Sequence, residues 1–168
     1  LATRLQQAGA NVVYGVVGFK VHAKGLLVVR RVANGIRRYV HLATGNYHAG
    51  TARFYTDFGL MSTDPVLGED LHRLFLQVAG LGAAPEMKRL IQAPFHLASH
   101  LESLIDEEIA EARQGKEAWI RARMNSLTDP GIIRALYRAS KAGVKVDLMV
   151  RGVCRLRPGI LGISDNIS

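Results

Sequence analysis

The first half of the chain alternates short β-branched runs with glycine breaks, a pattern that predicts strands. Strands are expected over residues 11–17, 19–29 and 36–42. Asn34-Gly35 separates the second from the third and is typical of a type I′ hairpin turn, because both positions tolerate positive φ. Residues 51–60 are expected to form a further strand.

Apolar residues at helical spacing predict a helix after this strand region. Asp64-Pro65 supplies an acidic N-cap and a proline in the first turn, which is a helix start signal. Gly80 and Gly82 are expected to end this helix. Its apolar stripe consists of Leu67, Leu71, Leu74, Phe75 and Val78.

The second half of the chain predicts two more helices and two strands. One helix carries an apolar stripe at 101–112, and the next begins at Asp129-Pro130. Strands are expected at 119–124 and 145–151, on either side of the last helix. A β-α-β run of this kind predicts parallel strands, so the chain is assigned to the α/β class.

The predicted hairpin sets a register. With Asn34-Gly35 as the turn, Lys24 lies opposite Gly45, His22 opposite Tyr47, and His41 opposite Val28. His41 is then about 20 Å along the ladder from His22. On this register the two histidines share a face of the sheet but are not direct partners.

The segment Lys20-Val21-His22-Ala23-Lys24 carries candidate chemistry. On a strand, alternate residues share a face, so the His22 imidazole would lie between two ammonium groups. Lysine charge attracts phosphate, and histidine can act as a nucleophile toward phosphorus. The alternative is an exposed basic strand edge, where lysine is common. The adjacent loop Thr44-Gly45-Asn46 favours function, because it adds a hydroxyl, an amide and a closely approachable backbone.

A second basic segment follows the last predicted strand. Arg151, Arg155 and Arg157 lie with two glycines at its carboxyl end, where ligands gather in open α/β sheets. They could bind a phosphate group through bidentate contacts or form a solvated surface loop. Tyr55 could stack on a nucleotide base, or it could be a half-buried strand residue. The pair His96 and His100 has metal-ligand spacing, but no third ligand is evident nearby.

Charge and composition restrict the partners. The 168 residues include 22 Lys and Arg against 14 Asp and Glu, a net charge of +8 that favours anionic partners. Aromatic residues are 7% of the chain and do not alternate with basic ones, which argues against a nucleic-acid stacking surface. The single cysteine, Cys154, is expected to be a small buried side chain and fits a reducing compartment.

Several motifs resemble bacterial polyphosphate kinase of the large, histidine-phosphorylating type. They follow the order of that family along essentially the whole chain. The matching segments are Lys20-Val21-His22-Ala23-Lys24, 38–47, 51–57, Leu136-Tyr137-Arg138-Ala139-Ser140, Val150-Arg151-Gly152-Val153-Cys154 and 162–167. Ala43 and Gly25 depart from the family pattern without touching the nucleophile.

The resemblance implies a reversible transfer of the ATP γ-phosphate to a histidine and then to inorganic polyphosphate. His22 matches the phosphohistidine position, and His41 matches a second histidine that the family requires. Tyr55 and Arg151 match positions that contact the nucleotide (ATP or ADP). We assign Lys24 and Asn46 to binding of the same nucleotide.

The resemblance also implies an architecture. Residues 1–90 would be the later part of a first phospholipase D-like half, and residues 91–168 the beginning of a second. The family's Mg²⁺-binding arginines and a further histidine of the ATP site are expected outside these residues, so the fragment alone should be inactive. We expect a cytoplasmic homo-oligomer, in part associated with the inner face of the membrane, that does not bind nucleic acid.

Two other functions fit the same residues. A phospholipase D-type phosphodiesterase or nuclease also uses a His-x-Lys pair. Such motifs usually carry an aspartate downstream, and residues 25–30 contain no acid. A non-catalytic polyanion-binding module would use only the net charge and the 151–157 loop.

Overall fold

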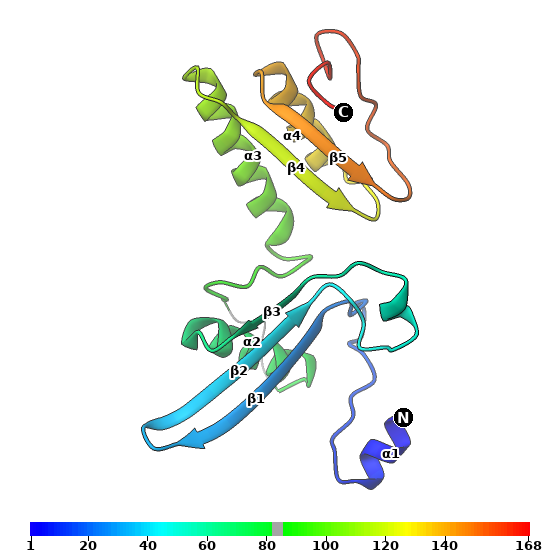
Figure 1. Cartoon of the computed structure of the whole chain (residues 1–168), viewed down its shortest axis with the longest axis vertical. Coiled ribbons are helices and arrows are strands. Elements are labelled where there is room, and N and C mark those ends of the chain that lie inside the picture. Colours follow the sequence, from blue (N-terminus) through cyan, green and yellow to red (C-terminus); the bar gives the residue numbers. More distant parts are fainter. Residues whose placement is uncertain (82–85) are drawn as a thin grey trace. The chain divides into compact units, whose positions relative to one another are not determined.

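The computed structural model describes residues 1–81 and 86–168, which form two compact units, Leu1–Leu90 and Ile91–Ser168. In chain order (Figure 1), unit 1 holds α1 (Ala2–Gln7), β1 (Lys24–Val32), β2 (Gly35–Ala43), η1 (Thr51–Arg53), β3 (Gly59–Ser62) and α2 (Pro65–Val78). Unit 2 holds α3 (Leu97–Arg113), β4 (Trp119–Met124), α4 (Pro130–Lys141) and β5 (Lys145–Val150).

Unit 1 is built on an antiparallel sheet in the order β1-β2-β3. Helix α2 packs on one face of it, where Val40 of β2 meets Leu67 and Leu71 of the helix. Gly25 makes this contact possible, because a Cβ there would lie 3.2 Å from Leu71 Cδ1. The opposite sheet face carries Lys24 and His41, so α2 does not cover the candidate chemistry.

The start of α2 confirms the predicted helix signal. The Asp64 carboxylate accepts hydrogen bonds from Val66 N at 2.9 Å and Leu67 N at 2.8 Å. The helix ends at Val78, and Gly80 follows with φ +75°. Gly82 lies outside the described residues.

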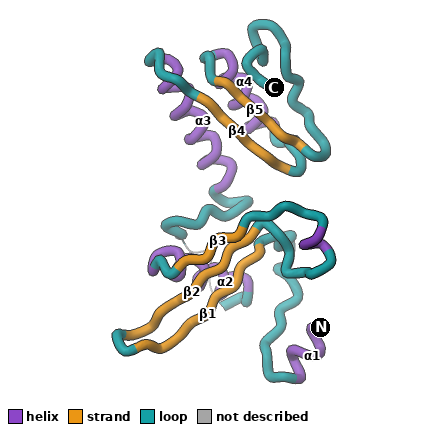
Figure 2. Tube along the Cα trace, in the orientation of Figure 1, coloured by secondary structure: helices purple, strands orange, loops and turns teal. Residues whose placement is uncertain are grey.

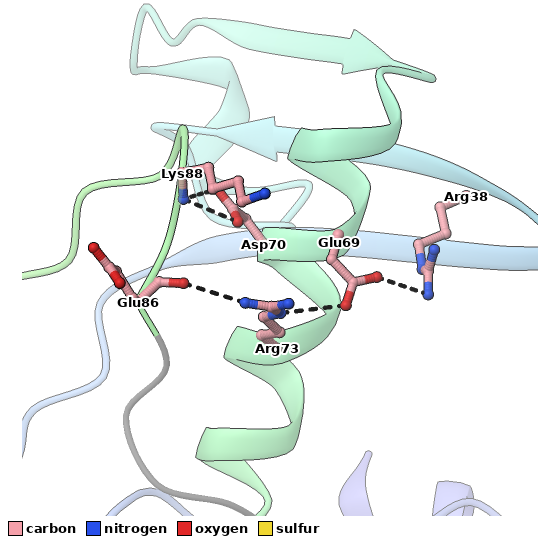
Figure 3. Close-up of polar contacts among 6 residues, drawn as sticks. All are labelled: Arg38, Glu69, Asp70, Arg73, Glu86 and Lys88. Carbon is pink, nitrogen blue, oxygen red and sulfur yellow. Dashed lines mark hydrogen bonds and ion pairs between the residues drawn. The ribbon is translucent and has the colours of Figure 1, made fainter.

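A buried carboxylate on α2 anchors the end of unit 1. Asp70 is 1% exposed and accepts hydrogen bonds from the backbone amides of Lys88, Arg89 and Leu90, the shortest being 2.6 Å from Arg89. Burial alone would raise its pKa, but these amides and the Arg73 charge together lower the pKa below its ordinary value. Figure 3 shows Asp70 with Lys88 beside the neighbouring ion pairs of Glu69.

Unit 2 is a two-stranded parallel sheet with both helices packed on one face. The predicted β-α-β run is confirmed, and Asp129 caps α4 by accepting from Ile132 N at 2.9 Å. The core gathers buried residues of α3, α4, β5 and the connection before β5, among them Ile105, Ile109, Ala135, Ala139, Val144 and Val146. Val146 thus anchors β5 in the core, and Arg151 directly follows the last residue of this strand.

Two predicted strands are wrong. Residues 11–17 are not a strand and pair only through the isolated bridge between Val16 and Phe19. Most of 51–60 is loop around η1, with strand only from Gly59 (Figure 2). β-Branched and aromatic residues form a strand only where a partner strand is available. Strand β2 ends at Ala43, before it could pair with either of these segments.

Candidate active site

The His22 segment lies just before the sheet rather than within it. Strand β1 begins at Lys24, not at Phe19, so the predicted strand face shared by Lys20, His22 and Lys24 is wrong. The physical reason is the length of the partner, because β2 ends at Ala43 opposite Lys24. Residues before Lys24 therefore have no hairpin partner in β2.

Lys24 nevertheless stays close to His22. Its ammonium Nζ donates a hydrogen bond of 2.7 Å to the backbone carbonyl of His22. The Lys24 side chain thus folds back along the segment that carries the histidine, whose side chain is exposed. A positive charge is held at the backbone of the candidate nucleophile by this contact.

The hairpin turn is Ala33-Asn34, not Asn34-Gly35. Gly35 has a φ of +117° and already pairs with Val32 as the first residue of β2. The single left-handed position at Gly35 does not make the type I′ turn that the sequence suggested. The register therefore moves by two residues.

The shifted register keeps the side chains of β1 and β2 on their predicted faces but moves His41 toward the open end of the hairpin. His41 lies opposite Leu26 rather than Val28, and Lys24 lies opposite Ala43 rather than Gly45. Leu26, the residue opposite His41, is thus two residues, or about 7 Å, from Lys24 along β1. The expected 20 Å separation from His22 rested on the wrong register.

The His41 ring is held between a tyrosine and a glycine. A hydrogen bond of 2.7 Å joins His41 Nδ1 and the Tyr47 hydroxyl, with ring centroids 5.6 Å apart. On the other side of the ring, His41 Nε2 would lie 3.0 Å from a Cβ on Gly59. The ring also borders an open pocket of about 360 Å³ lined in part by Leu26 and Met61.

The Thr44-Gly45-Asn46 loop is clamped by Asp57. Thr44 Oγ1 donates to Asp57 Oδ1 at 3.1 Å and accepts from Phe58 N at 2.9 Å. A Cβ on Gly45 would overlap the Asp57 carboxylate, so any larger residue there would displace the Asp57 side chain from its contact with Thr44. The Asn46 carbonyl accepts from His48 N at 2.8 Å. The clamp gives the loop a defined backbone path beside the end of β2.

Tyr55 lies on this loop region and not on a strand. It follows η1, and its backbone N donates to the Thr51 carbonyl at 3.3 Å. Tyr55 is 53% exposed, so it is not the half-buried strand residue of the alternative interpretation.

Arg151 belongs to unit 2, where it directly follows β5. Its backbone N donates to the Met124 carbonyl at 3.1 Å, and Gly152 N donates to the Asn125 carbonyl at 2.7 Å. A Cβ on Gly152 would lie 2.9 Å from that Asn125 oxygen, so the glycine allows the loop to approach β4 closely. The loop therefore starts from a fixed backbone position at the carboxyl ends of both strands.

The remainder of the 151–157 loop is also ordered by hydrogen bonds. Arg157 N donates to the Tyr137 hydroxyl at 2.9 Å, and the buried Ser164 hydroxyl donates to the Arg157 carbonyl at 2.8 Å. Leu156 is buried, whereas the flanking arginines Arg155 and Arg157 are exposed. Cys154 is exposed, so the expectation of a buried thiol is wrong. Leu156 provides the buried side chain of this loop instead.

The structure adds three site residues that sequence reasoning missed: Tyr47, Asp57 and Gly59. Tyr47 and Asp57 lie within the matching segments, but each of the three acts through a partner more than five residues away, so spacing along the sequence does not reveal its role. Within residues 1–81 and 86–168, no group of three His, Cys, Asp or Glu could hold a metal ion. The described helices also include none long and apolar enough to cross a membrane.

The fold and the arrangement of these residues define a phospholipase D-like α/β protein. A solved structure supports that class: polyphosphate kinase from Porphyromonas gingivalis matches 99% of this chain with a TM-score of 0.88 and 36% identity, and the match covers 28% of that chain. Family models match in two parts, polyphosphate kinase C-terminal domain 1 over residues 1–84 and C-terminal domain 2 over residues 90–168.

Curated relatives give the same result. Polyphosphate kinase of Pseudomonas aeruginosa is 59% identical over 167 residues, and that of Xylella fastidiosa is 55% identical over 167 residues; each match covers 99% of this chain. The chain belongs to the polyphosphate kinase family, which confirms the resemblance seen in its motifs. It spans about a quarter of the length of these relatives, 24% in both cases.

Proposed function

We propose that this chain supplies the phosphohistidine and part of the nucleotide site of an ATP–polyphosphate phosphotransferase. In the first step the His22 imidazole attacks the γ-phosphorus of ATP, an N–P bond forms, and the P–O bond to ADP breaks. In the second step the terminal oxygen of inorganic polyphosphate attacks phosphorus, and the N–P bond breaks. The same steps in reverse make ATP from ADP.

One contact supports this proposal most directly: the 2.7 Å hydrogen bond from Lys24 Nζ to the His22 carbonyl. It keeps an ammonium beside an exposed histidine, where positive charge stabilises the oxygens of a transferring phosphoryl group. Positioning and charge account for most of the catalysis in phosphoryl transfer, so a held cation is the feature to expect next to the nucleophile.

The remaining site residues receive roles by the same chemistry. We assign the Thr44-Gly45-Asn46 backbone and the Asn46 amide to phosphate oxygens, and Tyr55 to the nucleotide. The Arg151 guanidinium is assigned to nucleotide phosphates, which it can bind in bidentate fashion. Mg²⁺ is proposed as a cofactor of the parent protein, where it would neutralise charge on the transferring phosphoryl group.

The architecture is part of the proposal. Unit 1 is assigned to the later part of a first phospholipase D-like half and unit 2 to the beginning of a second. The basis is the match of two successive C-terminal domain models to the two segments. A cytoplasmic, homo-oligomeric parent protein without nucleic-acid partners, associated in part with the inner face of the membrane, is likewise proposed on the family resemblance.

The experiment is phosphorylation of the full-length parent protein with γ-labelled ATP. We expect acid-labile, base-stable label on His22, lost in His22→Gln and retained in the matched control His100→Gln, whose histidine is exposed on α3. Chasing with polyphosphate should remove the label, and ADP should regenerate labelled ATP. Tight polyanion binding without labelling would instead establish a binding module, and phosphodiester hydrolysis without labelling would establish a phosphodiesterase.

A further inference from the structure

The orientation of the His41 ring is held both by its backbone pairing and by a side-chain hydrogen bond. Its backbone is in the middle strand of the sheet, paired with Leu26 on one side and Met61 on the other. Its ring then meets the Tyr47 hydroxyl at Nδ1, at 2.7 Å. A ring whose backbone and one nitrogen are both held has a single orientation.

That orientation aims Nε2 toward the end of β2. His41 pairs with Met61, yet its Nε2 lies near Gly59, which precedes Met61 by two residues in β3 and pairs with Ala43. Ala43 in turn lies opposite Lys24. The Nε2 atom of His41 therefore leans toward the end of the sheet where Lys24 and the Thr44-Gly45-Asn46 loop lie.

The partner of one ring nitrogen decides the chemistry of the other. A neutral imidazole carries one proton, so one nitrogen donates and the other accepts. If the tyrosine O–H donates to Nδ1, the proton must reside on Nε2. An Nε2–H group can donate a hydrogen bond to an anionic oxygen, but it has no lone pair with which to attack phosphorus.

We propose that Tyr47 is a positioning residue for His41. Its hydroxyl donates to Nδ1, holds the ring proton on Nε2, and so makes His41 a hydrogen-bond donor toward a phosphate oxygen rather than a second nucleophile. Gly59 completes the arrangement by leaving space beside Nε2. This inference deepens the proposed function and rests on it for the identity of the anion.

Two variants of the full-length parent protein test the two contacts separately. Tyr47→Phe removes the hydroxyl and keeps the ring, while Gly59→Ala adds a Cβ 3.0 Å from Nε2 and keeps the tyrosine. Tyr14→Phe is the matched control, because Tyr14 is 74% exposed and lies outside the sheet. Thermal unfolding midpoints for Tyr47→Phe and Tyr14→Phe should agree.

The decisive readout is ¹⁵N NMR of histidine-labelled protein, with the His41 signals assigned by loss in His41→Gln. We expect an unprotonated Nδ1 and a protonated Nε2 in the parent protein and in Tyr14→Phe, and a mixture of tautomers in Tyr47→Phe. A protonated Nδ1 in the parent protein, or an unchanged pattern in Tyr47→Phe, would overturn the inference.

Kinetics supply the second readout. Losing one positioning hydrogen bond should lower kcat for polyphosphate synthesis by about tenfold in Tyr47→Phe, with KM for ATP within about twofold. Gly59→Ala should lower kcat in the same way. Unchanged kcat in both variants would also overturn the inference. If His22 takes no label from ATP, the proposed function fails, and the tautomer pattern alone then decides the role of Tyr47.

Discussion

Replacing Asp70 with asparagine should release the backbone of residues 88–90 from helix α2. The carboxylate is 1% exposed and receives hydrogen bonds from three successive amides, at 2.6 to 3.1 Å. Asparagine keeps the shape but removes the charge, and its NH₂ group cannot accept from the amides it would face. A hydrogen bond to an ionised group is worth about 1.5–3 kcal/mol, and in asparagine one neutral oxygen at most remains to accept from the three amides.

The assay is hydrogen exchange of peptides that contain residues 88–90 in the full-length protein. Because about 1.4 kcal/mol corresponds to a factor of ten, these amides should exchange about ten to a hundred times faster in Asp70→Asn. Glu69→Gln is the matched control: Glu69 is the preceding residue on α2, with 40% of its side chain exposed in its ion pairs to Arg38 and Arg73, and such pairs contribute little. Equal protection in Asp70→Asn and the unmodified protein would refute the reasoning.

The same contact predicts a pH dependence with a definite sign. Burial alone would raise the Asp70 pKa, but the amides of Arg89, Leu90 and Lys88 bring the pKa below its ordinary value of 3.8. A lowered folded-state pKa contributes stability that is fully present above the unfolded value and is lost as pH falls through the folded value. Protection of residues 88–90 should therefore persist at pH 5–7, decline below about pH 4, and show no such decline in Asp70→Asn.

Three further substitutions have expected outcomes. Thr44→Val removes the hydrogen bond to Asp57, so we expect faster exchange of the 44–46 loop amides and a severalfold lower kcat in the full-length protein. Asp129→Ala removes the α4 N-cap and should lower the free energy of unfolding by about 1 kcal/mol. The measurement is hydrogen exchange, which should be faster for the amides of the first turn of α4. Gly25→Leu places a branched side chain against Leu71 and should lower the free energy of unfolding by about 1–3 kcal/mol. Unit 1 should then be cleaved more readily by protease. Wild-type behaviour of any of these variants would contradict the corresponding contact.

Local signals in the sequence determined the helices and the parallel strand pair. Asp64-Pro65 and Asp129-Pro130 marked two helix starts, because an N-cap acts within three residues of itself. The strands at 119–124 and 145–150 followed from apolar alternation on either side of a helix. The faces of the hairpin were also correct, because an even shift of register conserves them.

Only the tertiary structure decided how the candidate site is arranged. The hairpin register depended on the φ of Gly35, and the start of β1 depended on where its partner strand ends. His41 depends on Tyr47 and Gly59, two positions to which the sequence attached no role, and the 44–46 loop depends in the same way on Asp57. Motifs in the sequence identified the residue types suited to phosphate chemistry. Contacts between residues distant in sequence determine how the His41 ring and the 44–46 loop are held, because only chain folding brings those partners together.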